Sequence, residues 1–268
     1  MLHQLRHRRV ARRFALTASS AIIALGLCGC QTDLSDVTGS LGPNADSSRP
    51  VDSKAQLDTY RERYRASPKD AGTALQYGRA LRAAGQKSQA VAVLEEATIA
   101  NPGNKQLLGE FGRALSDNGN FEQAFEVLGQ AHSPDDPDWR ILSAQGAVLD
   151  QLGRFEEARR YYASALKIRP DEPSVLSNLG LSYLLSKDLP KAEENLRKAN
   201  AKSDDPRVRQ NLALVIGLQG RFAEAEALLK KDRPAEEATA NIAYLKQLLA
   251  HKGSAHAEAD KPSSEQHN

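Results

Sequence analysis

The chain has 268 residues, of which 26% are charged and 5% aromatic, a composition typical of a folded region with polar ends. Its formal charge is +2, but the first 29 residues hold five arginines, and the rest keeps 36 − 5 = 31 basic against 34 acidic side chains, a charge of −3. A mildly acidic chain with few aromatic residues lacks the clustered basic face that nucleic-acid binding needs, so we exclude nucleic acid as a partner.

Residues 1–29 have the pattern of an export signal. Five arginines without any acidic residue precede the apolar stretch Phe14–Leu27, which ends in small residues. At about 1.5 Å per residue, a helix of this stretch would be roughly 21 Å long, too short for the roughly 30 Å hydrocarbon core of a bilayer. We therefore expect a cleaved signal peptide and not a permanent membrane span.

The two cysteines of the chain, Cys28 and Cys30, follow this stretch directly. The sequence Leu27-Cys28-Gly29-Cys30 resembles a bacterial lipobox, which implies cleavage before Cys30 and lipidation of that residue. The alternatives are a plain Sec signal and a thiol oxidoreductase using both cysteines, although a disulfide across one residue would be strained. Gln31 after the lipidated cysteine implies, by resemblance to lipoproteins of enteric-type bacteria, delivery to the outer membrane, facing the periplasm.

Polar segments without apolar periodicity flank the central region. Residues 30–53 are rich in Ser, Asp, Gly and Pro and predict a flexible tether, and residues 251–268 predict a disordered tail. The folded region is expected at residues 54–250, and the lipid on Cys30 would be its only attachment to a membrane.

A 34-residue pattern of small residues recurs through the central region. It is most regular in residues 139–172, where positions 8, 15, 20, 27 and 32 hold Gly146, Gly153, Ala158, Ala165 and Pro170. The units in this frame are residues 71–104, 105–138, 139–172, 173–205 and 206–232. The pattern resembles tetratricopeptide (TPR) repeats, which implies an all-α, right-handed solenoid of about five helical hairpins.

Each hairpin requires a close helix approach and a tight turn. We expect Gly146 and Ala158 to face each other, because only Gly or Ala lets two helix backbones approach. Gly153 suits a left-handed residue between the helices, whereas the fourth unit has Lys187 at that position. Additional helices are expected at residues 54–66, before the first unit, and at 235–250, where the helix would cap the stack.

TPR proteins bind peptides or partner helices in a groove lined by the first helix, helix A, of each repeat. Carried over to this chain, the resemblance implies the following partner-binding residues: Arg79, Arg82, Arg113, Arg140, Asn178, Leu181, Leu184, Leu185, Asn211, Leu214 and Leu218. The alternatives are a solvated charged face for the arginines, hairpin packing for the asparagines, and burial beneath the capping helix for the leucines.

The sequence predicts no catalytic, cofactor or metal site. The run Ser133–Trp139, SPDDPDW, lacks the glycine and distal glutamate of a calcium loop, and we expect it to form a turn with Asp138 as a helix cap. The histidines have no metal-ligand spacing, and no nucleophile elbow, phosphate loop or paired-acid motif occurs. The residues favour a binding protein over an enzyme.

Three segments resemble TadD-like TPR lipoproteins of the tight-adherence (Tad, or Flp) pilus assembly system. They are Ser174–Ala199, Asp205–Leu228 and Ala240–Leu249. This resemblance implies an outer-membrane-anchored periplasmic scaffold whose partners are the pilus secretin or other pilus assembly components, and which supports adherence. The alternative is a TPR adaptor for other envelope work, such as outer-membrane protein insertion or recruitment of cell-wall enzymes.

Overall fold

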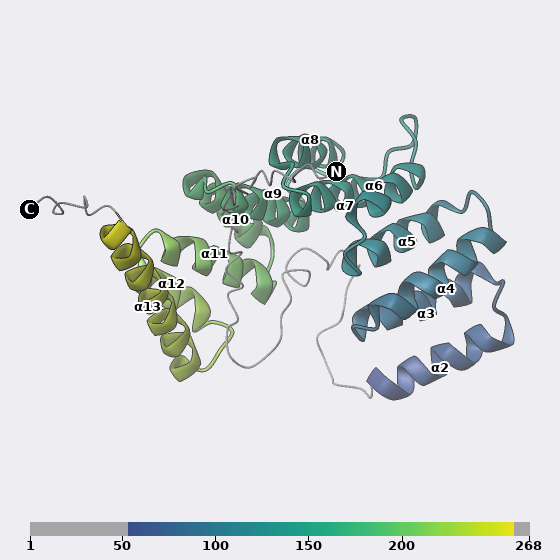
Figure 1. The fold of residues 1–268 in the computed structure, drawn as a ribbon, viewed down its shortest axis with the longest axis horizontal. Coiled ribbons are helices and arrows are strands. Elements are labelled where there is room, and N and C mark those ends of the chain that lie inside the picture. Colours follow the sequence, from purple (N-terminus) through teal and green to yellow (C-terminus); the bar gives the residue numbers. More distant parts are fainter. Residues whose placement is uncertain (1–52, 260–268) are drawn as a thin grey trace, which may run out of the picture. The chain divides into compact units, whose positions relative to one another are not determined.

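The computed structural model describes residues 53–259, and every regular element in this range is a helix (Figure 1). In chain order the helices are α2 (Ser53–Ala66), α3 (Ala71–Ala83), α4 (Lys87–Ala100), α5 (Lys105–Asp117), α6 (Phe121–Gln130), α7 (Trp139–Gln151), α8 (Phe155–Ile168), α9 (Pro173–Leu185), α10 (Leu189–Lys202), α11 (Pro206–Leu218), α12 (Phe222–Leu229) and α13 (Ala235–Ala259). The expected signal peptide, Cys30 and residues 31–52 of the expected tether lie outside the described residues.

The helices pack in series. Each helix from α2 to α12 contacts the next one along the chain, and each odd-numbered helix from α3 to α11 also contacts the next odd-numbered one. We call α3, α5, α7, α9 and α11 the A helices and α4, α6, α8, α10 and α12 the B helices. Stacked A/B hairpins form an α-solenoid, so the predicted all-α solenoid is confirmed.

Several A helices begin at a side-chain cap. Asp70 accepts a hydrogen bond from the Thr73 amide at 2.8 Å, and Asn104 accepts from the Leu107 amide at 3.1 Å. Asp138 accepts from the amide of Arg140 at 2.7 Å. These contacts satisfy N–H groups that have no partner inside the helix. The prediction that Asp138 caps the third A helix is confirmed.

A residue with left-handed backbone geometry lies between each A helix and its B helix. Glycine occupies this position in four hairpins, and Gly153, with φ of 72°, confirms the expectation for the third. Lys187 occupies it between α9 and α10, with φ of 65°. Because a Cβ crowds the following carbonyl in this region, the lysine costs about 1–2 kcal/mol relative to a relaxed backbone.

Glycines within the A helices allow close packing against the B helices. A Cβ built on Gly146 would lie 2.7 Å from Tyr162 Cε1, and Ala158 supplies none of the three nearest atoms. A large side chain one turn further along α8 than Ala158 therefore fills the space beside the glycine, and the direct approach of Gly146 and Ala158 stays a prediction. Gly180 has the same relation to Leu196, and the carbonyl oxygen of Ala192, at the position that corresponds to Ala158, lies 3.1 Å from a Cβ built there.

The capping helix α13 is longer than the sequence predicts. It buries Ala238, Ile242 and Leu245 against α11 and α12, and it continues past Ala250 to Ala259. Alanine is the strongest helix former, and its recurrence in residues 250–259 favours this continuation. Residues 260–268 of the expected tail lie outside the described residues.

Candidate protein-binding surface on the A helices

The four arginines predicted to bind a partner lie on the first three A helices, in two different environments. Arg79 on α3 has a side chain that is 54% exposed, and Arg140 at the start of α7 is also exposed. Arg82 on α3 and Arg113 on α5 are only 13% and 11% exposed. Only Arg79 and Arg140 are therefore positioned to meet a partner without a rearrangement.

Glu110 on α5 holds three of these arginines together. Its Oε1 lies 3.1 Å from Arg79 Nε and 3.3 Å from Arg113 Nη1, and its Oε2 lies 2.9 Å from Arg82 Nη1. Arg82 Nε also donates to Asp117 Oδ2 at 2.6 Å. We call these five residues the arginine cluster. It joins α3 to α5 and therefore fixes the first repeat against the second.

Positive charge exceeds negative charge in the arginine cluster. Burial favours a neutral Glu110, but the charges of Arg113, Arg82 and Arg79 outweigh it and lower the pKa of this carboxyl. Burial also lowers the pKa of Arg113, where Glu110 opposes the effect and the like charges of Arg82 and Arg79 add to it. Arg113 Nε is buried without a hydrogen-bond partner. Within the cluster three guanidinium groups thus face two carboxylates, while Asp138 acts on Arg113 from outside it.

The two predicted asparagines contact the preceding repeat. Asn178 on α9 is buried and donates to Ser143 Oγ on α7 at 3.2 Å. Asn211 on α11 repeats this relation with Ser177 Oγ on α9, at 3.4 Å. Both asparagines occupy position 6 of their units, and Glu110 occupies the same position in the second unit. Position 6 therefore faces the preceding A helix in all three repeats.

The leucines predicted at the C-terminal end differ in their exposure. Leu181 is buried, Leu184, Leu214 and Leu218 are half-buried, and Leu185 is 37% exposed. The capping helix covers part of α11, since a Cβ built on Gly217 would lie 2.5 Å from Leu245 Cδ2. Of these leucines, Leu185 offers a partner the most accessible side chain.

A buried polar network that sequence reasoning missed lies next to this surface. Asp150 on α7 accepts a hydrogen bond from Ser182 Oγ at 2.6 Å and another from the Tyr162 hydroxyl at 2.8 Å. Burial raises the pKa of Asp150 to about 6, although both hydrogen bonds and the charge of Arg159 oppose the shift. The network connects α7, α8 and α9.

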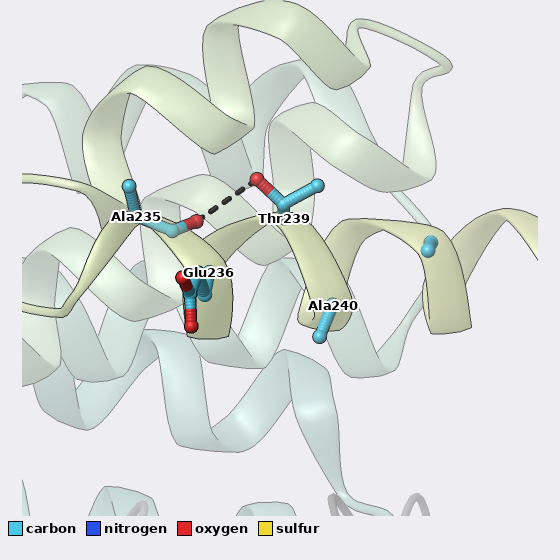
Figure 2. Close-up of a pocket in the computed structure, with 5 residues that line it drawn as sticks. Ala235, Glu236, Thr239 and Ala240 are labelled. Carbon is cyan, nitrogen blue, oxygen red and sulfur yellow. Dashed lines mark hydrogen bonds between the residues drawn. The ribbon is translucent and has the colours of Figure 1, made fainter.

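An open hollow lies on α13, and none of the predicted partner-binding residues lines it. Ala235, Glu236, Thr239, Ala240 and Ala243 line it, and Figure 2 shows the Thr239 hydroxyl donating to the Ala235 carbonyl, at 2.9 Å. Its lining is mostly alanine and offers little chemistry for a ligand. No group of three or more His, Cys, Asp or Glu side chains within the described part of the chain could hold a metal. Among residues 53–259, no helix is both long and apolar enough to cross a membrane.

Three protein-family models, each described as tetratricopeptide repeat, match residues 81–146, 143–206 and 206–231. No curated protein matches the sequence. Among solved structures, the chain is similar to a thermophilic TPR protein of Thermus thermophilus, with 23% identity, a TM-score of 0.59, and coverage of 66% of this chain and 100% of that one.

Two further structures share the fold. The type IV pilus biogenesis factor PilW has 17% identity and a TM-score of 0.61, with coverage of 71% of this chain and 91% of PilW. The APC/C hetero-tetramer Cut9-Hcn1 has 17% identity and a TM-score of 0.61, with coverage of 75% of this chain but only 40% of the matched chain. These likenesses establish the fold, and with the three matched models they show that the chain is a tetratricopeptide-repeat protein.

Proposed function

We propose that this chain is a lipid-anchored scaffold of the outer membrane that binds protein partners in the periplasm during assembly of a Tad (Flp) pilus. The observation that carries the scaffold role is the set of A helices, which present exposed side chains on the first, third and fourth of the stacked repeats: Arg79, Arg140 and Leu185. TPR proteins generally act by binding other proteins through such surfaces.

The pilus assignment is supported by sequence and by fold. Ser174–Ala199 and Asp205–Leu228 resemble TadD-like lipoproteins, and they correspond to the α9/α10 and α11/α12 hairpins. PilW, which has a similar fold, is a type IV pilus biogenesis factor. A solenoid of this kind therefore serves pilus biogenesis in at least one other protein.

The anchor is the second part of the proposal. Lipidation of Cys30 would place the solenoid at the membrane, and residues 31–52 would connect the lipid to α2. As a coil, about 22 residues would span roughly 25 Å. That length would hold the solenoid clear of the lipid headgroups.

The anchor is tested by replacing Cys30 with Ala in cells that make the pilus. We expect loss of piliation and mislocalisation of the secretin, and intact-mass analysis of the wild type should show cleavage before Cys30 with acyl chains attached. Unchanged piliation in the variant would refute the anchoring role. A mature protein that retains Cys28 would instead support the thiol oxidoreductase.

The binding surface is tested separately with Leu185→Asp. Leu181 is unsuitable because it is buried, and a charge there would unfold the solenoid. Ile99, which is 77% exposed on the B helix α4, provides the matched control Ile99→Asp. We expect only Leu185→Asp to reduce piliation and copurification of pilus components. Copurification of outer-membrane insertion proteins or cell-wall enzymes in their place would favour the alternative adaptor role.

A further inference from the structure

Two arginines on the first three A helices, Arg79 and Arg140, have exposed side chains. The side chain of Arg79 is 54% exposed and contacts a single carboxylate, Glu110. Arg140 is exposed and has no carboxylate partner among the described residues; its guanidinium instead stacks on the Trp139 ring, 4.5 Å from the ring centroid. Both guanidinium groups retain donors that can meet a partner's carboxylate.

Arg113 lies between these two exposed arginines in the order of the A helices. It is on α5, which contacts both α3 and α7. Its charge acts on Arg79's neighbour Glu110 and on Asp138, which precedes α7. Because Arg113 is 11% exposed, it adds positive potential beneath the surface without offering a contact of its own.

We propose that Arg79 and Arg140, supported by the charge of Arg113, bind an acidic, extended segment of the protein partner. This inference rests on the proposed scaffold function and specifies the chemistry of the partner. Carboxylates fit because a guanidinium presents paired donors that match the two oxygens of a carboxylate. A basic segment would be repelled by the excess positive charge of the arginine cluster, and a neutral segment would leave the guanidinium groups without a charged partner.

The spacing of the A helices favours an extended segment. Packed helices lie about 8–10 Å apart, and an extended chain advances roughly 3.3 Å per residue. A segment that crosses α3, α5 and α7 would therefore bring about every third residue to the next A helix. Acidic residues at that interval would reach Arg79 at one end and Arg140 at the other.

The test uses the full chain in detergent and a fluorescein-labelled nonapeptide with Glu at every third position between Ser and Gly. A peptide with Gln in place of Glu is its control. Fluorescence polarisation should show binding of the acidic peptide only. We expect Arg79→Gln and Arg140→Gln each to weaken binding about fivefold, as expected for loss of one partly exposed charge-assisted contact.

The matched control is Arg160→Gln, which removes the same charge from an exposed position of the B helix α8. It should leave the affinity unchanged, and thermal unfolding should show that all three variants are folded. An equal loss in Arg160→Gln, or equal binding of the Gln peptide, would overturn the proposal because binding would then not depend on the A-helix arginines.

One further outcome concerns the chain's own acidic residues. If the peptide binds only after Asp33, Asp36, Asp46 and Asp52 are replaced by Asn, this surface is occupied by the chain itself, and its assignment to a partner is overturned. If the peptide never binds while piliation still depends on Cys30 and Leu185, the acidic segment is refuted and the scaffold function survives. Loss of dependence on Cys30 and Leu185 would refute the scaffold function itself.

Discussion

Tyr162 on α8 donates its phenolic hydrogen to Asp150 on α7 across 2.8 Å, and the two residues are buried. The same tyrosine ring packs against Gly146, one turn earlier on α7. Ser182 on α9 completes the arrangement by donating to the other carboxyl oxygen of Asp150. The middle of the solenoid is thus fixed by a carboxyl group that burial makes costly to ionise.

The raised pKa of Asp150 predicts that the stability of the fold depends on pH. Its pKa is about 6 in the folded chain against an ordinary value of 3.8, so the folded state binds this proton more tightly than the unfolded state. The contribution of Asp150 to the free energy of unfolding is fully present below pH 3.8 and is lost as pH rises through 6. The loss amounts to about 3 kcal/mol for a shift of roughly two pKa units.

Urea denaturation of the wild type and of Asp150→Asn at several pH values checks this prediction. Carboxyls with a lowered pKa, such as Glu110 and Glu193, give the opposite slope, so the difference between the two proteins isolates Asp150. The wild type should lose stability relative to the variant between about pH 4 and pH 6. A constant difference across this range would show that Asp150 titrates normally.

Lys187→Gly should stabilise the chain. Lys187 has a φ of 65°, in the region where the other four hairpins have glycine. Glycine removes the Cβ strain but adds freedom to the unfolded chain, and the net gain should be about 1 kcal/mol. The reverse change, Gly153→Lys, should cost about 1–2 kcal/mol. Thermal denaturation of both variants measures these effects, and a destabilised Lys187→Gly would mean that the lysine side chain makes a contact worth more than the strain.

Local features of the fold follow directly from the sequence, whereas contacts between repeats do not. Gly153 and Asp138 act within a few residues of their own position, and their roles as turn and cap can therefore be predicted from the chain alone. Asp150 meets Ser182 across 32 residues. Such a pair depends on how one hairpin rotates against the next, which a repeat frame does not specify.

The candidate surface shows the same division. The repeat frame places Arg82 and Arg79 on one A helix, but the exposed fraction of each depends on the next repeat, where Glu110 and Asp117 lie. A polar residue recurs at position 6, as Glu110, Asn178 and Asn211. This recurrence is a signal in the sequence that could have identified the contacts to the preceding A helix.

Gly146→Ala should destabilise the solenoid. The new methyl would lie 2.7 Å from Tyr162 Cε1, and the tyrosine cannot move away without breaking its hydrogen bond to Asp150. Overpacking of this kind costs about 1–3 kcal/mol. Gly129→Ala in α6 is the matched control, because the new methyl would lie 3.6 Å from its nearest neighbour outside the helix, Gln145 Nε2. That variant should gain up to about 1 kcal/mol from helix propensity, and equal effects in both would refute the close contact.

Substitution of Asn178 distinguishes a role in packing between repeats from a role in partner binding. Asn178→Ala leaves the fully buried Ser143 hydroxyl without this donor, so we expect a loss of about 1–2 kcal/mol in the free energy of unfolding. A double-mutant cycle with Ser143→Ala, measured by urea denaturation, should give a coupling of about 1 kcal/mol.

Asn211→Ala provides the comparison, since its contact with Ser177 is longer, at 3.4 Å, and only partly buried. It should cost less stability than Asn178→Ala and couple more weakly to its serine, because a partly hydrated amide loses less when its partner is removed. If Asn178→Ala weakens partner binding while stability and coupling stay unchanged, its amide serves the partner and not the preceding repeat. Loss of stability with unchanged binding would assign position 6 to the contact between repeats, so that partner recognition would depend on Arg79, Arg140 and Leu185.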